Sequence, residues 1–570
     1  MALDSGRPRV TDDVRRANDR HRHWVPVFVL GFLLLVAYVW TDWMADYPPP
    51  GVESLRDLTV VKRAFDSDGH LRTSMFMYSW ADMDRDVQRQ VLMLLVAIGF
   101  LCTYYLPLAY KRPPLVAVTC AGIGWVLGPT TMALFLAWHM IAYATFHPPP
   151  ARSRGTLAGL AFLALCLWLS FAHPRSPDLL IVLVGAALTT PVLYLLYARV
   201  YLRLLQGPAR RWLQACMAHA CLIYLGVSLL GTWLLGDSLL PRILGWLLFF
   251  WQWERVVMYH ADLTDGRIPG TPPLIEYLAI FLTPAALCNF HWLSRIPLGY
   301  SYVTNAFLAR DKNQVILSGV WLITLAVLFF ALRPVALELF RLAMAALDIE
   351  PLHRYGSLVR ALGRGEVSVI AVWCVLFHAF LSFALLWAGV SHLKVGLWRL
   401  FGYDIERYMQ KPYKATNLVE LWRRYSYHYR EFLVRVFYYP VFLRCFKKHL
   451  RLRIFVATFA AAGFGNLVYH IVWASLFRGP TPEIFLARMG TIPYYILLGA
   501  GIAATQVWLV ERGHTRREPW TGGWRISFDL FAVASTFGFF ILIRPFHHIP
   551  QDYPMMEALR VMLAAFAIDV

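Results

Sequence analysis

The chain has 570 residues, of which 58% are hydrophobic and 16% charged, and its formal net charge is +19. A soluble protein of this length needs a far more polar surface, and runs of about 20 apolar residues recur throughout, which is the membrane-spanning signal. Most Lys and Arg residues fall between these runs, as the positive-inside bias of a polytopic membrane protein predicts, so we expect a lipid bilayer and no nucleic acid as partner. The eight cysteines show no spacing typical of a disulfide framework or zinc ribbon, and we expect no metal site.

The N-terminal part predicts the orientation of the chain in the cell membrane. Residues 1–23 are a polar tail with six arginines, which places the N-terminus in the cytoplasm. The apolar segment from Trp24 to Ala45 is longer than a signal-peptide core and is followed by no cleavage pattern, so we expect a retained anchor. Residues 46–90 then form a polar loop on the outer side, too small for an independent catalytic domain.

The rest of the chain predicts an all-α, multi-pass architecture. The next span runs from Val91 to Tyr110 and ends on a basic pair. Several of the later apolar runs are interrupted by Pro, Gly or charge, so we expect about 11–13 transmembrane or re-entrant helices. These runs cover residues 115–146, 156–172, 178–204, 215–250, 273–290, 315–346, 366–400, 454–477, 491–510, 526–543 and 555–569.

A basic amphipathic segment begins after Asn417. Its apolar residues, Tyr429 among them, recur at helical spacing from Leu421 to Phe437, which predicts one helix of five turns. Asn417 and Glu420 have the spacing of a capping box, and Pro440 predicts the end. Such a helix lies at a lipid interface or lines a polar cavity, and the interface is the simpler interpretation. The basic cluster that follows predicts a cytoplasmic turn, and it comprises Arg444, Lys447, Lys448, Arg451 and Arg453.

The apolar segment 454–477 carries one imidazole. Asn466 and His470 are four residues apart and share a helix face, well inside the segment. Polar groups at this depth usually face the protein interior or a cavity. A lone histidine on an apolar helix is more often a structural hydrogen-bonding group than a catalyst. Depth alone does not separate His470 from the histidines of other apolar segments, which are His139, His219, His291 and His378.

Several short runs together resemble one enzyme family, the membrane-bound O-acyltransferases, in the bacterial branch that acylates cell-envelope polymers. The similar runs are Pro412-Tyr413, Glu420-Leu421-Trp422-Arg423-Arg424, Tyr438-Tyr439-Pro440 and, earlier, Phe281-Leu282-Thr283-Pro284, with His470 placed 48 residues after Trp422. Two positions depart from the family pattern. Ser426 occupies the place of its second polar residue, with His428 two residues further on, and Ile471 stands where Gly usually follows the histidine.

The resemblance covers about residues 270–480 and implies a division of the chain. Residues 24–269 would be N-terminal membrane helices, 270–480 a catalytic core, and 481–570 C-terminal membrane helices. The implied activity is transfer of an acyl group, for example acetyl, from acyl-CoA or an acyl-carrier thioester to a hydroxyl of an envelope glycan, lipid or carrier protein. A partner extracytoplasmic acyltransferase is a second route to the acceptor, and no cofactor is bound permanently.

The resemblance also implies roles for particular residues. His470 would be the general base, because a neutral imidazole can accept the hydroxyl proton near pH 7. His428 is the candidate for the missing second polar residue, and Asn466 could orient His470 or the acceptor. The candidate donor-binding residues are Trp422, Arg423 and Arg424, whose guanidinium groups can hold phosphates.

Two alternatives stay open. The first is a transporter or flippase, but no span carries the acidic chain expected for ion coupling; Glu338 and Arg341 come nearest, and their spacing lets them pair with each other. The second is an inactive member of the family, for which Ser426 would be the reason.

Overall fold

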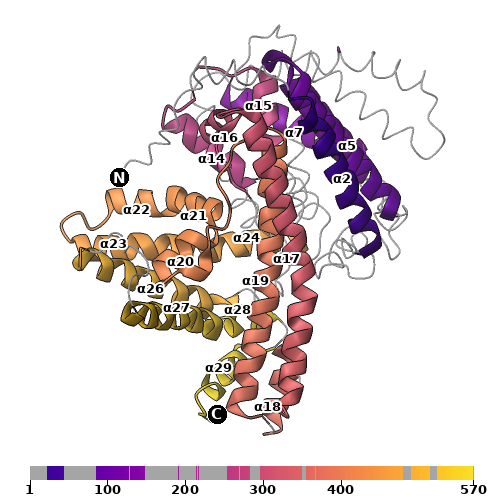
Figure 1. Cartoon of the computed structure of the whole chain (residues 1–570). Coiled ribbons are helices and arrows are strands. Elements are labelled where there is room, and N and C mark those ends of the chain that lie inside the picture. Colours follow the sequence, from indigo (N-terminus) through magenta and orange to yellow (C-terminus); the bar gives the residue numbers. More distant parts are fainter. Residues whose placement is uncertain are drawn as a thin grey trace, which may run out of the picture.

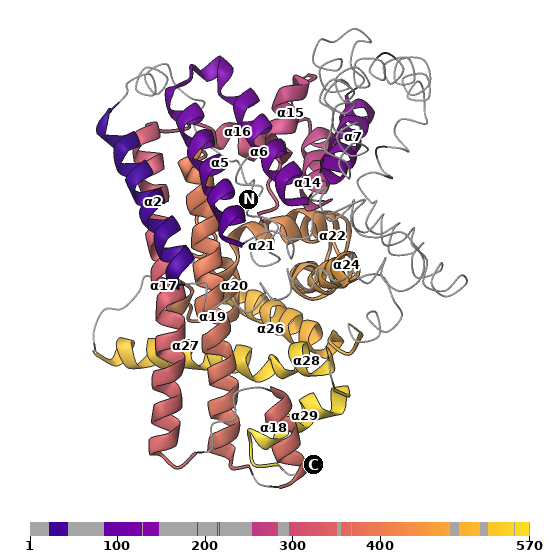
Figure 2. The same cartoon turned by 90° about the vertical axis from the view of Figure 1, so that its right-hand side faces the viewer.

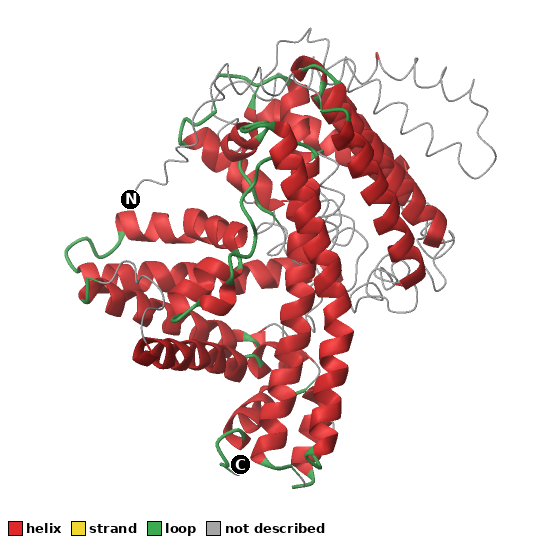
Figure 3. Cartoon of the chain, in the orientation of Figure 1, coloured by secondary structure: helices red, strands yellow, loops and turns green. Residues whose placement is uncertain are grey.

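The computed structural model is helical throughout the part of the chain that it describes (Figure 3). That part comprises residues 22–43, 85–127, 129–147, 253–268, 270–282, 296–349, 355–365, 367–478, 489–513, 523–551 and 553–568, with residues 191, 214 and 216. Within it, the only β-type pairing is one isolated bridge between Phe307 and Tyr403. The all-α class expected from the apolar runs is confirmed.

The N-terminal helices begin where the first apolar segment was expected. They are α2 (Trp24–Trp43), α5 (Arg85–Tyr105), α6 (Arg112–Leu127) and α7 (Pro129–Phe146). Residues 85–90, at the end of the expected outer loop 46–90, already belong to α5. Residues 46–84, the tail up to residue 21 and the apolar runs at 156–172, 178–204 and 215–250 lie outside the described residues, apart from residues 191 and 216.

Two long helices form an antiparallel pair that stands upright in Figures 1 and 2. They are α17 (Lys312–Ala346) and α19 (Val369–Leu400), joined through α18 (Tyr355–Gly363). Each begins at a side-chain cap: Asp311 accepts a hydrogen bond from the backbone N–H of Asn313, and Ser368 accepts one from that of Ala371. Two glycines allow the backbones to approach closely, since a Cβ on Gly319 would lie 2.8 Å from the carbonyl oxygen of Gly396.

The region around the candidate motifs consists of shorter helices that run across this pair (Figures 1 and 2). In chain order they are α20 (Leu418–Tyr425), α21 (Tyr427–Leu433), the π-helical turn η6 (Val434–Tyr438), α22 (Tyr439–Arg444), α23 (Leu450–Phe459), the π-helical turn η7 (Ala460–Gly465), α24 (Asn466–Arg478), α26 (Ile492–Glu511), α27 (Gly523–Ile543), α28 (Pro545–His548) and α29 (Met555–Ala564). Upstream of the long pair lie α14 (Trp253–Thr264), α15 (Leu274–Phe281) and α16 (Tyr300–Ala306).

The single amphipathic helix expected after Asn417 is broken. Its cap is confirmed, because Asn417 Oδ1 accepts from the backbone N–H of Glu420 at 2.9 Å. The helix then stops at Ser426, whose φ of −147° and ψ of 68° are not helical. The preceding connection pairs with the backbone at this break: the N–H of Gln410 donates to the Arg424 carbonyl, and that of Tyr427 donates to the Tyr408 carbonyl. Tertiary hydrogen bonds therefore replace the helical ones.

Pro440 does not end the helix, contrary to the sequence-based expectation. The π-helical turn η6 precedes it, and the N–H of Tyr439 donates to the carbonyl of Val434, five residues back. Pro440 then lies in the first turn of α22. The π-helical turn shifts the hydrogen-bond register just before Pro440, and this accommodates the proline without ending the helix.

Five described helical segments are long and apolar enough to cross a membrane, at Lys312–Ala346, Val369–Leu400, Leu450–Val472, Ile492–Glu511 and Ile526–His548. The protein is therefore a polytopic membrane protein. Helix α29, in the expected apolar run 555–569, has only ten residues and is too short to cross a membrane as a helix. The total of 11–13 helices stays a prediction, since three of the apolar runs lie outside the described residues.

Candidate functional site

Four aromatic or imidazole rings surround His470, and they come from four different elements. The ring centroid of His470 lies 6.4 Å from Tyr429 on α21, 5.6 Å from Tyr469 on its own helix α24, 5.5 Å from Tyr495 on α26 and 5.6 Å from His547 on α28. The His470 side chain is nevertheless only half-buried. The imidazole therefore lies among packed helices but keeps a surface that a small group can reach.

Asn466 lies one helical turn before His470 and is fixed by a neighbouring phenol. The hydroxyl of Tyr429 donates a hydrogen bond of 2.7 Å to Asn466 Oδ1. Burial raises the pKa of the Tyr429 phenol well above its ordinary value, so it remains a neutral donor at physiological pH. The π-helical turn η7 ends at Gly465, and such turns occur frequently at functional sites. Tyr429 therefore contacts both residues: its hydroxyl bonds to Asn466, and its ring lies beside that of His470.

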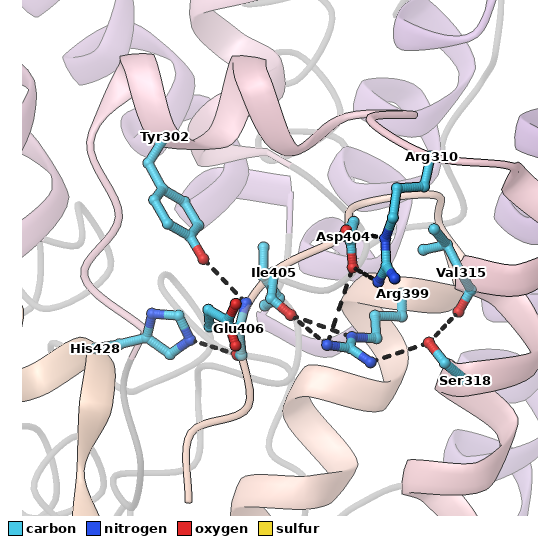
Figure 4. A network of polar contacts seen from close by, with 9 residues as sticks. All are labelled: Tyr302, Arg310, Val315, Ser318, Arg399, Asp404, Ile405, Glu406 and His428. Atoms are coloured by element: carbon cyan, nitrogen blue, oxygen red, sulfur yellow. Dashed lines mark hydrogen bonds and ion pairs between the residues drawn. The ribbon is translucent and has the colours of Figure 1, made fainter. Parts of the chain in front are cut away.

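His428 belongs to a different group of side chains. It is buried, and its Nε2 lies 2.8 Å from the carbonyl oxygen of Glu406. A carbonyl only accepts, so Nε2 carries the proton. Its ring neighbours are Tyr302, Tyr408 and Tyr427. Figure 4 shows the Glu406 backbone between His428 and Tyr302, whose hydroxyl accepts from the Glu406 N–H at 2.9 Å. These contacts fasten the connection between α19 and α20.

Two arginines anchor the beginning of the same connection (Figure 4). Arg310 donates twice to the Asp404 carboxylate, at 2.6 and 2.5 Å, and this bidentate contact raises the pKa of the arginine. Arg399 donates to the Ile405 carbonyl at 3.1 and 2.8 Å and to the Ser318 hydroxyl at 3.0 Å. The start of the connection between α19 and α20, from Asp404 to Glu406, is therefore held by Arg310 from the segment before α17 and by Arg399 of α19.

The candidate donor-binding residues lie together on α20. Arg423 and Arg424 both pair with Glu420, at 3.4 and 3.0 Å, and the Arg423 side chain is 44% exposed. An exposed arginine in such a pair contributes little stability, so Arg423 can exchange a carboxylate for a phosphate at small cost. The Arg424 side chain is only 26% exposed and also donates to the Gln410 carbonyl at 3.4 Å. Trp422 is half-buried and packs against the hydrophobic cluster that contains Leu421 and Tyr495.

Three residues around His470 were not recognised in the sequence. Tyr429 was counted as an apolar position of the amphipathic segment, and its hydroxyl matters only once α21 packs on α24. Tyr495 and His547 lie beyond residue 480, in helices that carry no part of the family resemblance. No local spacing connects His547 with His470, 77 residues earlier.

Ser426 is buried at the break between α20 and α21 and forms a side-chain hydrogen bond with Tyr408.

Comparison with known proteins adds no relative to this picture. No family model matches the chain, and no curated protein matches it. In the part of the chain that the structure describes, no three His, Cys, Asp or Glu side chains gather as a metal site would require. The resemblance to the acyltransferase family rests on the motif residues themselves.

Proposed function

We propose that this membrane protein transfers an acyl group from a thioester donor to a hydroxyl of a cell-envelope glycan, lipid or carrier protein. The observation that carries the proposal is the setting of His470: a half-buried imidazole on an apolar helix, beside Asn466, with Tyr429 bonded to that amide. The motif residues that resemble the acyltransferase family supply the reaction class.

The chemistry of the residues fits acyl transfer. The acceptor oxygen attacks the thioester carbon, a C–O bond forms, the C–S bond breaks, and His470 takes the hydroxyl proton. The Asn466 amide group holds position because Tyr429 donates to its oxygen, which leaves the amide N–H groups for the acceptor or the developing oxyanion. The donor, an acyl-CoA or acyl-carrier thioester, would enter from the cytoplasm, with phosphates on Arg423 and Arg424.

The transporter alternative has weaker support. Glu338 and Arg341 were the nearest candidates for ion coupling, and they pair with each other at 2.6 and 2.9 Å on the outer surface of α17. An exposed pair that satisfies itself gives no path for a coupled ion, so we favour the enzyme.

Replacement of His470 by Gln tests the proposal. Gln keeps a hydrogen bond of similar reach but cannot take a proton, so acyl incorporation into envelope material should fall by roughly 10²–10⁴ at normal protein level. His392→Gln is the matched control, since His392 also lies on a membrane helix, half-buried, with its Nδ1 2.7 Å from the Ala388 carbonyl oxygen. Near-normal incorporation by His470→Gln would overturn the proposal and favour an inactive or transporting protein.

A further inference from the structure

A second imidazole faces His470 from the C-terminal region. The rings of His470 and His547 have centroids 5.6 Å apart and lie at 83° to each other. Both side chains are half-buried. At this separation a direct hydrogen bond or one bridging water can carry a proton between the rings. The reaction as described above gives His547 no role.

The neighbouring residues hold His547 in this position. Arg544 is buried over the ring of Phe383, 4.0 Å from its centroid, and donates to His548 Nε2 at 2.8 Å. His548 in turn stacks on Tyr355, with ring centroids 5.5 Å apart. The short helix α28 is therefore fastened through His548. Its other histidine, His547, contacts Tyr494 and Tyr495 of α26 as well as His470.

Two imidazoles this close cannot be protonated independently. A charge on one disfavours a charge on the other, so we expect the two rings to titrate as a coupled pair, in two steps. The other titratable groups facing the pair are His548, whose ring centroid lies 4.8 Å from that of His547, and the phenols of Tyr429, Tyr469, Tyr494 and Tyr495. His548 Nε2 accepts from the permanently charged Arg544, which opposes protonation of His548 at that nitrogen.

We propose that His547 is the proton partner of His470. This inference rests on the proposed acyl transfer. His470 takes the proton of the acceptor hydroxyl as the C–O bond forms, and the proton passes to His547. It then returns to the thiolate released when the C–S bond breaks, so the products are the ester and a free thiol. A thiolate is a better leaving group than an alkoxide, so loss of His547 should slow transfer less than loss of His470.

The closing experiment measures the titration of His470 without requiring acyl transfer. The full-length protein in membranes is treated with diethyl pyrocarbonate at a series of pH values, and modification of His470 is quantified by mass spectrometry. Wild type should show a broad titration in two steps. In His547→Asn the like charge is gone, so the imidazolium of His470 is easier to form, and we expect one step with its midpoint raised by about one pH unit. His547→Gln gives a second test of the same position.

His392→Asn is the matched control, because His392 is also a half-buried histidine on a membrane helix but packs against Phe329 and not against the rings around His470. It should leave the two-step titration of His470 in place. One-step titration in wild type, or equal effects of the His547 and His392 variants, would overturn the inference. A coupled titration combined with normal incorporation by His470→Gln would instead keep the histidine pair and remove the acyltransferase proposal.

The pH–rate profile gives the second readout. In the His547→Asn variant a proton on His470 no longer meets a like charge, so we expect the basic form of His470 to be lost at a higher pH as the solution is acidified. The acid limb of acyl incorporation by His547→Asn should therefore move to higher pH. A fall in rate at all pH values with an unmoved limb would assign His547 a packing role only.

Discussion

At the scale of single residues, the sequence pointed to Asn466 and His470 on α24 but not to the side chains that surround them. The four-residue spacing of Asn466 and His470 placed them on one helix face. Tyr429 could not be predicted, because a tyrosine at an apolar position packs its ring in the same way whether or not its hydroxyl has a partner. Only the contact between α21 and α24 shows that this hydroxyl bonds to Asn466.

Tyr429→Phe isolates that hydrogen bond. The ring stays beside His470, while Asn466 loses the donor that fixes its amide. We expect a loss of stability of about 1 kcal/mol and, because Asn466 is no longer oriented, a fall of roughly tenfold in kcat. Thermal unfolding and acyl incorporation measure the two effects. Tyr425→Phe is the matched control, since the Tyr425 hydroxyl has no hydrogen-bond partner among the described residues. An unchanged kcat in Tyr429→Phe would separate Asn466 from the reaction.

At the scale of elements, helix positions were predictable and helix interruptions were not. Periodicity and the Asn417 cap correctly marked where α20 begins. The break at Ser426 depends on hydrogen bonds from residues 408–410, which no local pattern contains. Pro440 was taken as a stop because a proline disrupts an α-helix, but η6 supplies a π-helical turn that accommodates it. In both cases tertiary contacts overrode local propensity.

The α17–α19 pair gives an element-scale prediction. A Cβ on Gly396 would lie 2.7 Å from Ile323 Cγ1 and 2.9 Å from the Gly319 carbonyl oxygen. The backbone carbonyl cannot move without separating the helices, so Gly396→Ala should cost about 1–3 kcal/mol of stability. Gly538→Ala in α27 is the control, because a Cβ there meets nothing within 4 Å. It should be neutral or slightly stabilising, since Ala favours helix over Gly. Equal melting temperatures for the two variants would contradict the close contact.

At the scale of the whole molecule, helix length and direction bear on how the protein lies in the bilayer. Helix α17 has 35 residues and is about 52 Å long, well beyond the hydrocarbon thickness of about 30 Å. Helices α26 and α27, with 20 and 21 residues, match that thickness and run across the long pair (Figure 1). The membrane normal cannot be parallel both to the α17–α19 pair and to α26 and α27. Tilting α17 and α19 from the normal lets their extra length fit within the bilayer. Hydropathy alone could predict the spans but not these directions.

The last prediction concerns which end of the molecule faces the cytoplasm. The turn between α22 and α23 exposes Cys445 among the basic residues Arg444, Lys447 and Lys448. Arginine and lysine beside membrane helices are retained on the cytoplasmic side, and the arginines before Trp24 predict the same side for the N-terminus. A membrane-impermeant maleimide applied to intact spheroplasts should therefore leave Cys445 unmodified and label a Ser67→Cys variant. After permeabilisation Cys445 should react, and mass spectrometry identifies the labelled cysteine. Labelling of Cys445 but not of Ser67→Cys in intact spheroplasts would reverse the orientation, and the thioester donor would then have to reach His470 from the other side of the membrane.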